Sequence, residues 1–123
     1  MLSPFGKLLR KMRIDRDKTL ADLAGLANVS TAFVSAVETG RKAVPPSFID
    51  AVTRGLSLTA SEESSLAQAA AGQAKEVTIS LANGSDRARE LAVAFARRFE
   101  NLSEGEVESL FKQIAPPRGD KDA

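Results

Sequence analysis

Apolar side chains recur at helical spacing along the first part of the chain. Phe5, Leu8, Leu9 and Met12 follow the i, i+3, i+4, i+7 pattern of an amphipathic helix, and Pro4 suits its first turn. This pattern predicts a helix from Pro4 to about residue 14. Basic side chains cover the rest of this helix, and most of them are typical of an outer face in water: Lys7, Arg10, Lys11 and Arg13.

Three pairs of residues have the spacing of a capping box, in which Ser or Thr is followed three residues later by an acidic residue. The pairs are Thr19–Asp22, Thr59–Glu62 and Ser103–Glu106. They predict helix starts near residues 20, 60 and 104. We expect the first of these helices to run over 20–27 and the second over 60–72, where it buries Leu66, Ala69 and Ala70.

A sharp turn is predicted between residues 27 and 30. Asn28 is among the residues that best tolerate positive φ, which such a turn between crossing helices usually needs. Ser30 is a good N-cap for a third helix, which we expect to end near Thr39, with Gly40 closing it. Ala24 is small where the two helices must approach closely.

Pro45-Pro46 forbids continuation of that helix and suits the start of a fourth. The apolar stripe of the fourth helix consists of Phe48, Ile49, Val52 and Leu56. Together with the helix over 60–72, these five helices have enough apolar residues to close one small core.

Residues 76–81 are the one strand candidate. Val77, Ile79 and Leu81 alternate with Thr78 and Ser80, which is the pattern of a half-buried strand. A single strand cannot satisfy its own backbone hydrogen bonds, so it needs a partner strand, most simply from a second copy of the chain. Two-stranded pairing is marginal alone, and flanking helices would have to support it.

Two more amphipathic helices are expected beyond the turn at Asn83-Gly84. The first runs from the N-cap Ser85 to about Asn101, and the second follows Ser103 and stops at Pro116-Pro117. The chain thus divides into residues 1–72, 73–116 and a polar tail over 117–123 that we expect to be disordered.

Composition narrows the classes of function. The chain of 123 residues contains no Cys and no His, which excludes a disulfide framework and removes the commonest general base and metal ligand. Acidic clusters lie at helix starts, where the helix dipole explains them, and there is no glycine-rich phosphate loop. We therefore expect no catalytic residue, no metal site, no cofactor and no enzyme activity. No apolar run approaches a membrane span, so we expect a cytoplasmic protein.

The net charge of +1 is unevenly distributed. Residues 1–54 contain nine basic and five acidic side chains, whereas residues 55–123 contain eight basic and eleven acidic ones. A basic first half suits a polyanionic partner such as DNA.

Residues 5–58 resemble the helix-turn-helix domain of the Xre family, the class that contains the phage lambda repressor. The resemblance rests on Thr19-Leu-Ala-Asp-Leu-Ala24, Asn28-Val-Ser30, Val34, Val37-Glu38 and Gly40-Arg-Lys42, followed by Pro45. Asn28 departs from the family's usual Gly. The resemblance implies an all-α fold with a five-helix repressor-like helix-turn-helix domain. The patterns described above add a short strand and a two-helix C-terminal segment, which resembles a dimerisation appendage found on some family members.

In the family that this chain resembles, the third helix lies in the major groove of double-stranded DNA. The expected base contacts are Ser30, Thr31, Ala32, Phe33, Ser35 and Ala36, and the expected phosphate contacts are Lys18, Thr19, Arg41 and Lys42. Phe33 either packs against the protein or meets a thymine methyl or sugar edge. Glu38 is interpreted as structural, because phosphate repels an unpaired carboxylate.

This third helix has none of the Arg, Gln or Asn side chains that read guanine or adenine best. Two alternatives follow. Either hydroxyls, methyl contacts and DNA shape specify the sequence, or the helix reads little and specificity comes from Arg41 or Lys42.

Beyond DNA binding, residues 76–114 have alternative roles. A homodimer, most simply a repressor, would pair through Val77, Ile79, Leu81, Phe95 and Phe99. Alternatively, residues 76–114 bind another protein, as in antitoxins and anti-activators, or residues 85–114 fold back on the first domain of the same chain.

Overall fold

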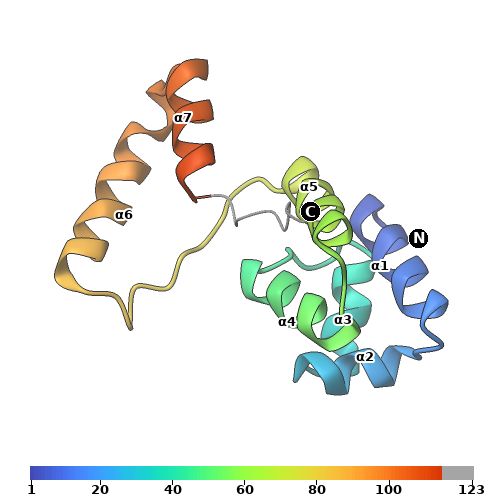
Figure 1. Cartoon of the computed structure of the whole chain (residues 1–123). Coiled ribbons are helices and arrows are strands. Elements are labelled where there is room, and N and C mark those ends of the chain that lie inside the picture. Colours follow the sequence, from blue (N-terminus) through green and yellow to red (C-terminus); the bar gives the residue numbers. More distant parts are fainter. Residues whose placement is uncertain (115–123) are drawn as a thin grey trace. The chain divides into compact units, whose positions relative to one another are not determined.

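The computed structural model describes residues 1–114, and these residues form helices joined by loops (Figure 1). The elements are α1 (Pro4–Asp15), α2 (Leu20–Ala27), α3 (Thr31–Glu38), α4 (Pro46–Leu56), α5 (Ala60–Gln73), α6 (Asp86–Arg98), a 3-10 turn η1 (Phe99–Asn101) and α7 (Glu104–Ile114). The predicted helices are confirmed, with ends that differ by a few residues. The tail predicted over 117–123 lies outside the described residues.

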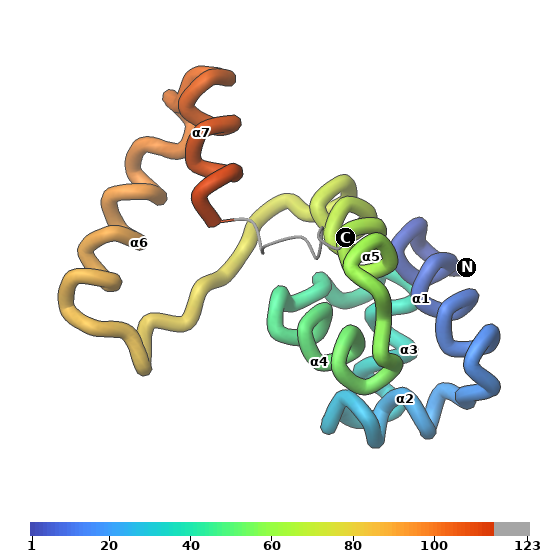
Figure 2. Tube along the Cα trace, in the orientation of Figure 1, coloured from blue at the N-terminus to red at the C-terminus, as the bar shows by residue number. Residues whose placement is uncertain are grey.

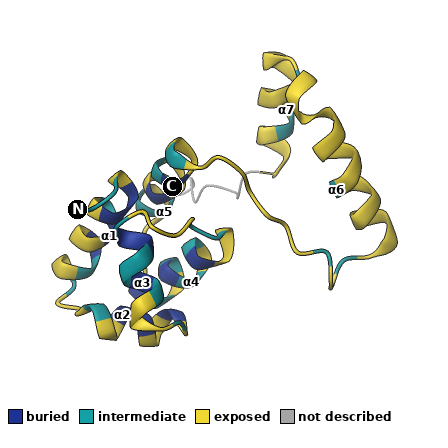
Figure 3. Ribbon diagram, turned by 180° about the vertical axis from the view of Figure 1, so that it is seen from behind, coloured by how far each residue is buried: buried dark blue, intermediate teal, exposed yellow. Residues whose placement is uncertain are grey.

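The chain divides into two compact units, Met1–Val77 and the part that begins at Thr78. In the first unit, α2 packs against α3 and α4, while α1 packs against α3 and α5. Figure 3 shows the buried residues on the inner faces of α1–α5. The core of this unit is formed by Phe5, Leu9, Met12, Leu23, Ala24, Ala27, Val34, Val37, Phe48, Val52, Leu56, Leu66 and Ala70.

The predicted capping boxes are confirmed at the starts of α2 and α5. At α2, the Thr19 hydroxyl accepts a hydrogen bond from the Asp22 N–H at 3.0 Å, and the Asp22 carboxylate accepts from the Thr19 N–H at 2.9 Å. Thr59 and Glu62 repeat this exchange at 3.1 and 2.9 Å. The local sequence therefore fixes where these helices begin.

Arg16 joins three helices of the first unit. Its guanidinium donates to the Leu56 carbonyl at 2.9 Å, to the Met12 carbonyl at 3.1 Å and to the Glu62 carboxylate at 2.8 Å. These bonds tie the end of α1 to the end of α4 and the start of α5. Arg16 lies directly after α1, and it thus stabilises all three of these helix ends.

The strand predicted over 76–81 is wrong. These residues lie in the non-helical segment that follows α5 (Figure 2). None of residues 1–114 forms a strand. The side chains of Val77 and Ile79 are 66% and 60% exposed. The apolar alternation is present, but a strand also needs a neighbouring strand for its backbone hydrogen bonds, and the described residues provide none.

The second unit contains α6, η1 and α7. Neither α6 nor α7 contains a buried residue. An ion pair between Arg98 and Glu106 at 3.2 Å joins the two helices, and the Ser103–Glu106 capping box, as predicted, starts α7. Most large apolar side chains on α6, η1 and α7 are exposed: Leu91, Val93, Phe95, Phe99, Val107, Phe111 and Ile114.

No single helix within residues 1–114 is long and apolar enough to span a membrane. Together α2 and α3 have the length and apolar composition of a span, but the two helices are bent by 108°.

Candidate nucleic-acid interface

The corner between α2 and α3 is built by Asn28. Its φ of 58° and ψ of 46° are left-handed, as its position in the sequence predicts. The Val29 N–H donates to the Ala24 carbonyl at 2.9 Å and the Asn28 N–H to the Gly25 carbonyl at 3.2 Å, which is the Schellman pattern of a helix end. The resulting bend of 108° lies within the range of helix-turn-helix motifs.

Ser30 is the N-cap of α3, and its hydroxyl accepts a hydrogen bond from the Phe33 N–H at 3.0 Å. Val34 and Val37 are fully buried and hold the inner face of α3 on the core. The opposite face presents the other predicted base contacts: Thr31 and Ala32 are exposed, and Ser35 and Ala36 are half-buried. The structure therefore brings these residues together on one side of α3.

Phe33 lies against the protein. Its ring is half-buried and meets the ring of Phe48 edge-on, with 5.5 Å between centroids. The Lys42 ammonium lies 5.8 Å from the Phe33 ring centroid on its face, within range of a cation–π interaction. Of the two alternatives for Phe33, the structure favours packing against the protein, with the ring also positioning Lys42.

Two cations follow α3 on a fixed backbone. Gly40 adopts a φ of 80°, and the N–H groups of Arg41 and Lys42 both donate to the Ala36 carbonyl, at 2.9 and 3.2 Å. Both side chains are exposed, and neither forms an ion pair with a residue in the described range. Arg41 and Lys42 thus stand beside the outer face of α3 with their charges available to a phosphate.

The start of α2 is less open to an anion than the sequence suggests. The Thr19 N–H and hydroxyl are both used in the capping box with Asp22, and this Thr19 N–H is the main reason that the pKa of the Asp22 carboxyl lies below its usual value. A carboxylate therefore already occupies this helix N-terminus. The exposed Lys18 remains available for the predicted phosphate contact.

A buried ion pair holds the end of α3 on α1. The Arg13 Nε donates to the Glu38 carboxylate at 3.1 Å, and the two side chains are only 12% and 6% exposed. The Ser3 N–H and hydroxyl both donate to the Glu38 carbonyl, at 2.9 and 3.2 Å. The structural interpretation of Glu38 is confirmed, whereas Arg13 was expected in water. The sequence does hold one indication that Arg13 is buried: on a helical wheel it lies beside the core residues Leu9 and Met12.

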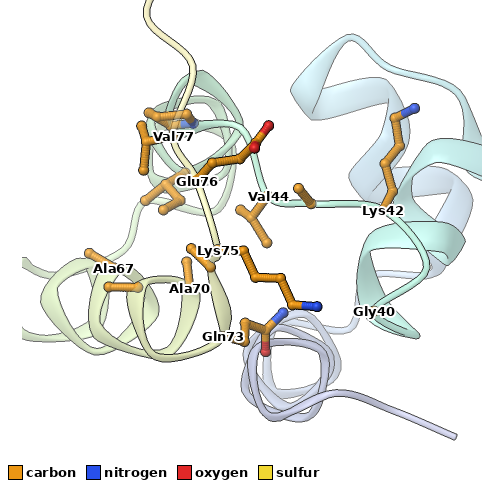
Figure 4. A pocket seen from close by; sticks show the side chains of 14 residues that line it. Gly40, Lys42, Val44, Ala67, Ala70, Gln73, Lys75, Glu76 and Val77 are labelled. Atoms are coloured by element: carbon orange, nitrogen blue, oxygen red, sulfur yellow. The ribbon is translucent and has the colours of Figure 1, made fainter. Parts of the chain in front are cut away.

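A cleft of about 510 Å³ lies in the first unit, beside the segment that leaves α3 (Figure 4). Its lining is largely apolar and includes Val44 and Ile49 from the α3–α4 side and Ala67 and Ala70 from α5. Lys42 lines one edge, but Figure 4 shows its ammonium directed away from Ala67 and Ala70. The charge of Lys42 therefore lies beside α3, over the Phe33 ring, and not inside the cleft.

Residues predicted for dimerisation lie in the segment after α5, on α6 and at the start of η1. Leu81 is half-buried, while Val77, Ile79, Phe95 and Phe99 are exposed. Phe95 near the end of α6 and Phe99 at the start of η1 lie side by side, with ring centroids 5.5 Å apart. The structure thus places an aromatic pair on an uncovered helix face of the second unit.

No group of three or more acidic, Cys or His side chains within the described part of the chain is arranged to hold a metal ion. Among residues 1–114, the carboxyls of Asp22, Glu62 and Glu106 have a lowered pKa, and in each the main cause is the hydrogen bond from the N-cap N–H. These shifts therefore report helix starts.

Comparison with known proteins gives two matches. A family described as "Helix-turn-helix domain" matches residues 4–66. The chain is also similar to a solved structure of the clp gene regulator ClgR from C. glutamicum, with 31% sequence identity, coverage of 60% of this chain and 94% of that chain, and a TM-score of 0.48. No curated protein matches the sequence.

Proposed function

Because this chain belongs to the helix-turn-helix domain family, we propose that it is a sequence-specific, DNA-binding transcriptional regulator that acts by binding rather than by catalysis. One observation carries the proposal: an exposed face of α3, held on a rigid corner, stands beside the accessible cations Arg41 and Lys42. A transcriptional regulator must share a compartment with the DNA that it binds, and we infer a cytoplasmic location.

In the proposed complex, α3 enters the major groove with Thr31, Ala32, Ser35 and Ala36 toward the base edges. Arg41 and Lys42 contact phosphates at the end of α3, and Lys18 contacts a phosphate near the start of α2. Phosphate contacts set the position of the protein on the duplex, while the groups on α3 carry the sequence preference.

A titration of labelled duplex DNA at several salt concentrations tests this function. Binding should weaken as salt rises, because each phosphate contact releases condensed counterions. Arg41→Ala should weaken binding to all sequences alike and reduce the salt slope by about one, whereas substitutions of Thr31 or Ser35 should change the preference among sites. Affinity that ignores salt, or that is equal for all sequences, would refute the proposal.

Repression is the finer part of the proposal. The motif residues of the first unit resemble the Xre family, and a protein that occupies a promoter in this way blocks access of the polymerase. A reporter gene placed behind the bound site should be expressed less when the chain is present, and increased expression would contradict repression.

We further propose that the chain acts as a homodimer through α6 and α7. Neither helix has a buried residue, and both expose large apolar side chains, so residues 78–114 of the second unit form no buried core of their own. Monomeric proteins rarely leave such contiguous apolar surfaces uncovered. Two copies would also present two α3 helices to half-sites about one helical turn apart.

Charge favours a second copy as the occupant. Helix α6 has four basic and two acidic side chains, while α7 has one basic and three acidic ones. A two-fold arrangement that crosses α6 of one chain with α7 of the other pairs opposite charges around the apolar face. Within one chain, an ion pair between Arg98 of α6 and Glu106 of α7 already shows this attraction.

The mass of the full chain in solution tests the pairing. The dimer should have twice the 13.0 kDa of one chain, and Phe95→Glu or Phe99→Glu should shift the mass toward the monomer without loss of helix content. A wild-type monomer that pairs only with a foreign protein would instead favour the antitoxin or anti-activator alternative, with the same apolar face as its docking surface.

A further inference from the structure

The outward face of α3 consists of methyl and hydroxyl groups. Thr31 and Ala32 are exposed, and Ser35 and Ala36 are half-buried. The one charged residue of α3, Glu38, is buried in its ion pair with Arg13 and is withdrawn from this face. The surface offered to a DNA groove therefore has no guanidinium, ammonium, amide or carboxylate group within α3.

Several side chains near this face already have contacts within the protein. The Ser30 hydroxyl accepts from the Phe33 N–H, and the Thr39 hydroxyl donates to the Ser35 and Ala36 carbonyls, at 3.0 and 3.3 Å. The Phe33 ring packs edge-on against Phe48. The methyl groups of Thr31, Ala32 and Ala36 and the hydroxyls of Thr31 and Ser35 remain free to contact bases.

The chemistry of base edges selects among possible targets. Guanine and adenine are read best by forked, bidentate side chains, and cytosine by a carboxylate, none of which α3 presents. Hydroxyls bond to donors and acceptors alike, so they discriminate poorly. The 5-methyl group of thymine is the apolar group in the major groove, and it matches the methyl groups on α3.

We propose that α3 selects its DNA sites by contact with thymine 5-methyl groups through the methyl groups of Thr31, Ala32 and Ala36. The proposal rests on the proposed DNA-binding function and names the feature of the DNA that is recognised. Because these side chains are short, the α3 backbone must approach the base edges closely. Arg41 and Lys42, whose N–H groups are fixed to the Ala36 carbonyl, anchor the helix at that distance.

Uracil-substituted DNA tests the inference. Sites for the full chain are first selected from random duplexes, and deoxyuridine then replaces each thymidine in turn, which removes only the methyl group. Each contacted methyl should contribute about fourfold in affinity, which corresponds to about 0.8 kcal/mol for a buried methyl-sized group. At most positions outside the α3 contact, uracil should change nothing.

Matched variants locate the contact. Thr31→Ser deletes one methyl group and keeps the hydroxyl, whereas Thr31→Val keeps a methyl group and deletes the hydroxyl. The ratio of affinities for thymine and uracil DNA is measured within each variant, so a change in overall stability does not affect it. At one position this ratio should fall toward one in Thr31→Ser and persist in Thr31→Val. Ala32→Gly and Ala36→Gly should each abolish the preference for thymine over uracil at a different position of the DNA site.

Two results would overturn the inference while leaving the proposed function intact. One is sequence-specific, salt-dependent binding in which uracil replaces thymine at every position without loss. The other is a thymine preference that none of the three methyl deletions reduces. If the chain binds no duplex at all, the inference falls together with the proposed function.

Discussion

Gly6 is the position where a single methyl group should disturb the placement of α3 most. A Cβ built on Gly6 would lie 1.8 Å from the Glu38 carbonyl oxygen and 2.6 Å from the Glu38 carbonyl carbon. Both atoms belong to the backbone at the end of α3, so no side-chain rotation relieves the overlap. Since carbon atoms in contact are about 3.5–4.0 Å apart, α1 and α3 must separate by roughly 1.5 Å.

The cost of Gly6→Ala follows from that separation. Overpacking of a close contact costs about 1–3 kcal/mol. The hydrogen bonds from Ser3 to the Glu38 carbonyl would weaken as well, each contributing about 1 kcal/mol. The gain in helix propensity offsets only about 0.5–1 kcal/mol. We expect a net destabilisation of about 2–4 kcal/mol, a large share of the stability of a small domain.

Urea unfolding followed by circular dichroism measures this change, with Gly25→Ala as the matched control. Gly25 is exposed in α2, and a Cβ there meets no atom within 4 Å, so this substitution should stabilise the chain by about 0.5–1 kcal/mol. Gly6→Ala should also weaken DNA binding under conditions where the variant is folded, because α3 is displaced. If both alanines shift the urea midpoint in the same direction, the close approach of α1 to α3 is wrong.

Three further substitutions test other parts of the account, each by urea unfolding of the full chain. Glu38→Ala should cost about 3–5 kcal/mol, because it leaves the Arg13 guanidinium buried without its partner, and the double variant with Arg13→Met should recover much of the loss; equal costs for single and double variants would contradict this. Thr53→Val should stabilise the chain by about 1 kcal/mol, since the Thr53 hydroxyl is buried without a hydrogen bond in the described structure; a loss of stability would show that the hydroxyl has a partner. The pKa of Glu62 is lowered in the fold, mainly by the Thr59 N–H, so the unfolded chain binds more protons and stability should fall as the pH drops below about 4.3. Glu62→Gln should reduce this dependence, and an unchanged pH profile would argue against the capping role.

Local signals in the sequence predict much of the first unit because each has a local physical cause. The capping pairs at Thr19 and Thr59 fix helix starts through hydrogen bonds three residues apart. Asn28 marks the corner because few residues tolerate its left-handed backbone. Pro46 marks the start of α4 because its fixed φ suits the first turn of a helix.

Features that depend on distant parts of the chain could not be predicted in this way. Arg13 looks like a solvated charge until α3 brings Glu38 beside it, 25 residues later. The need for glycine at position 6 appears only when the end of α3 lies on α1. Residues 76–81 have a strand pattern without a partner strand in the described chain, so the alternation alone misled the prediction.

The position of α3 in the proposed complex is the central claim, and residue-resolved NMR of the full chain during titration with a selected duplex tests it most directly. We predict that the largest amide shifts occur at Thr31–Ala36 and at Arg41 and Lys42, while α6 and α7 change little once the chain is dimeric. Shifts confined to α6 and α7, or spread evenly over the first unit, would contradict the assignment of α3 as the DNA-reading helix.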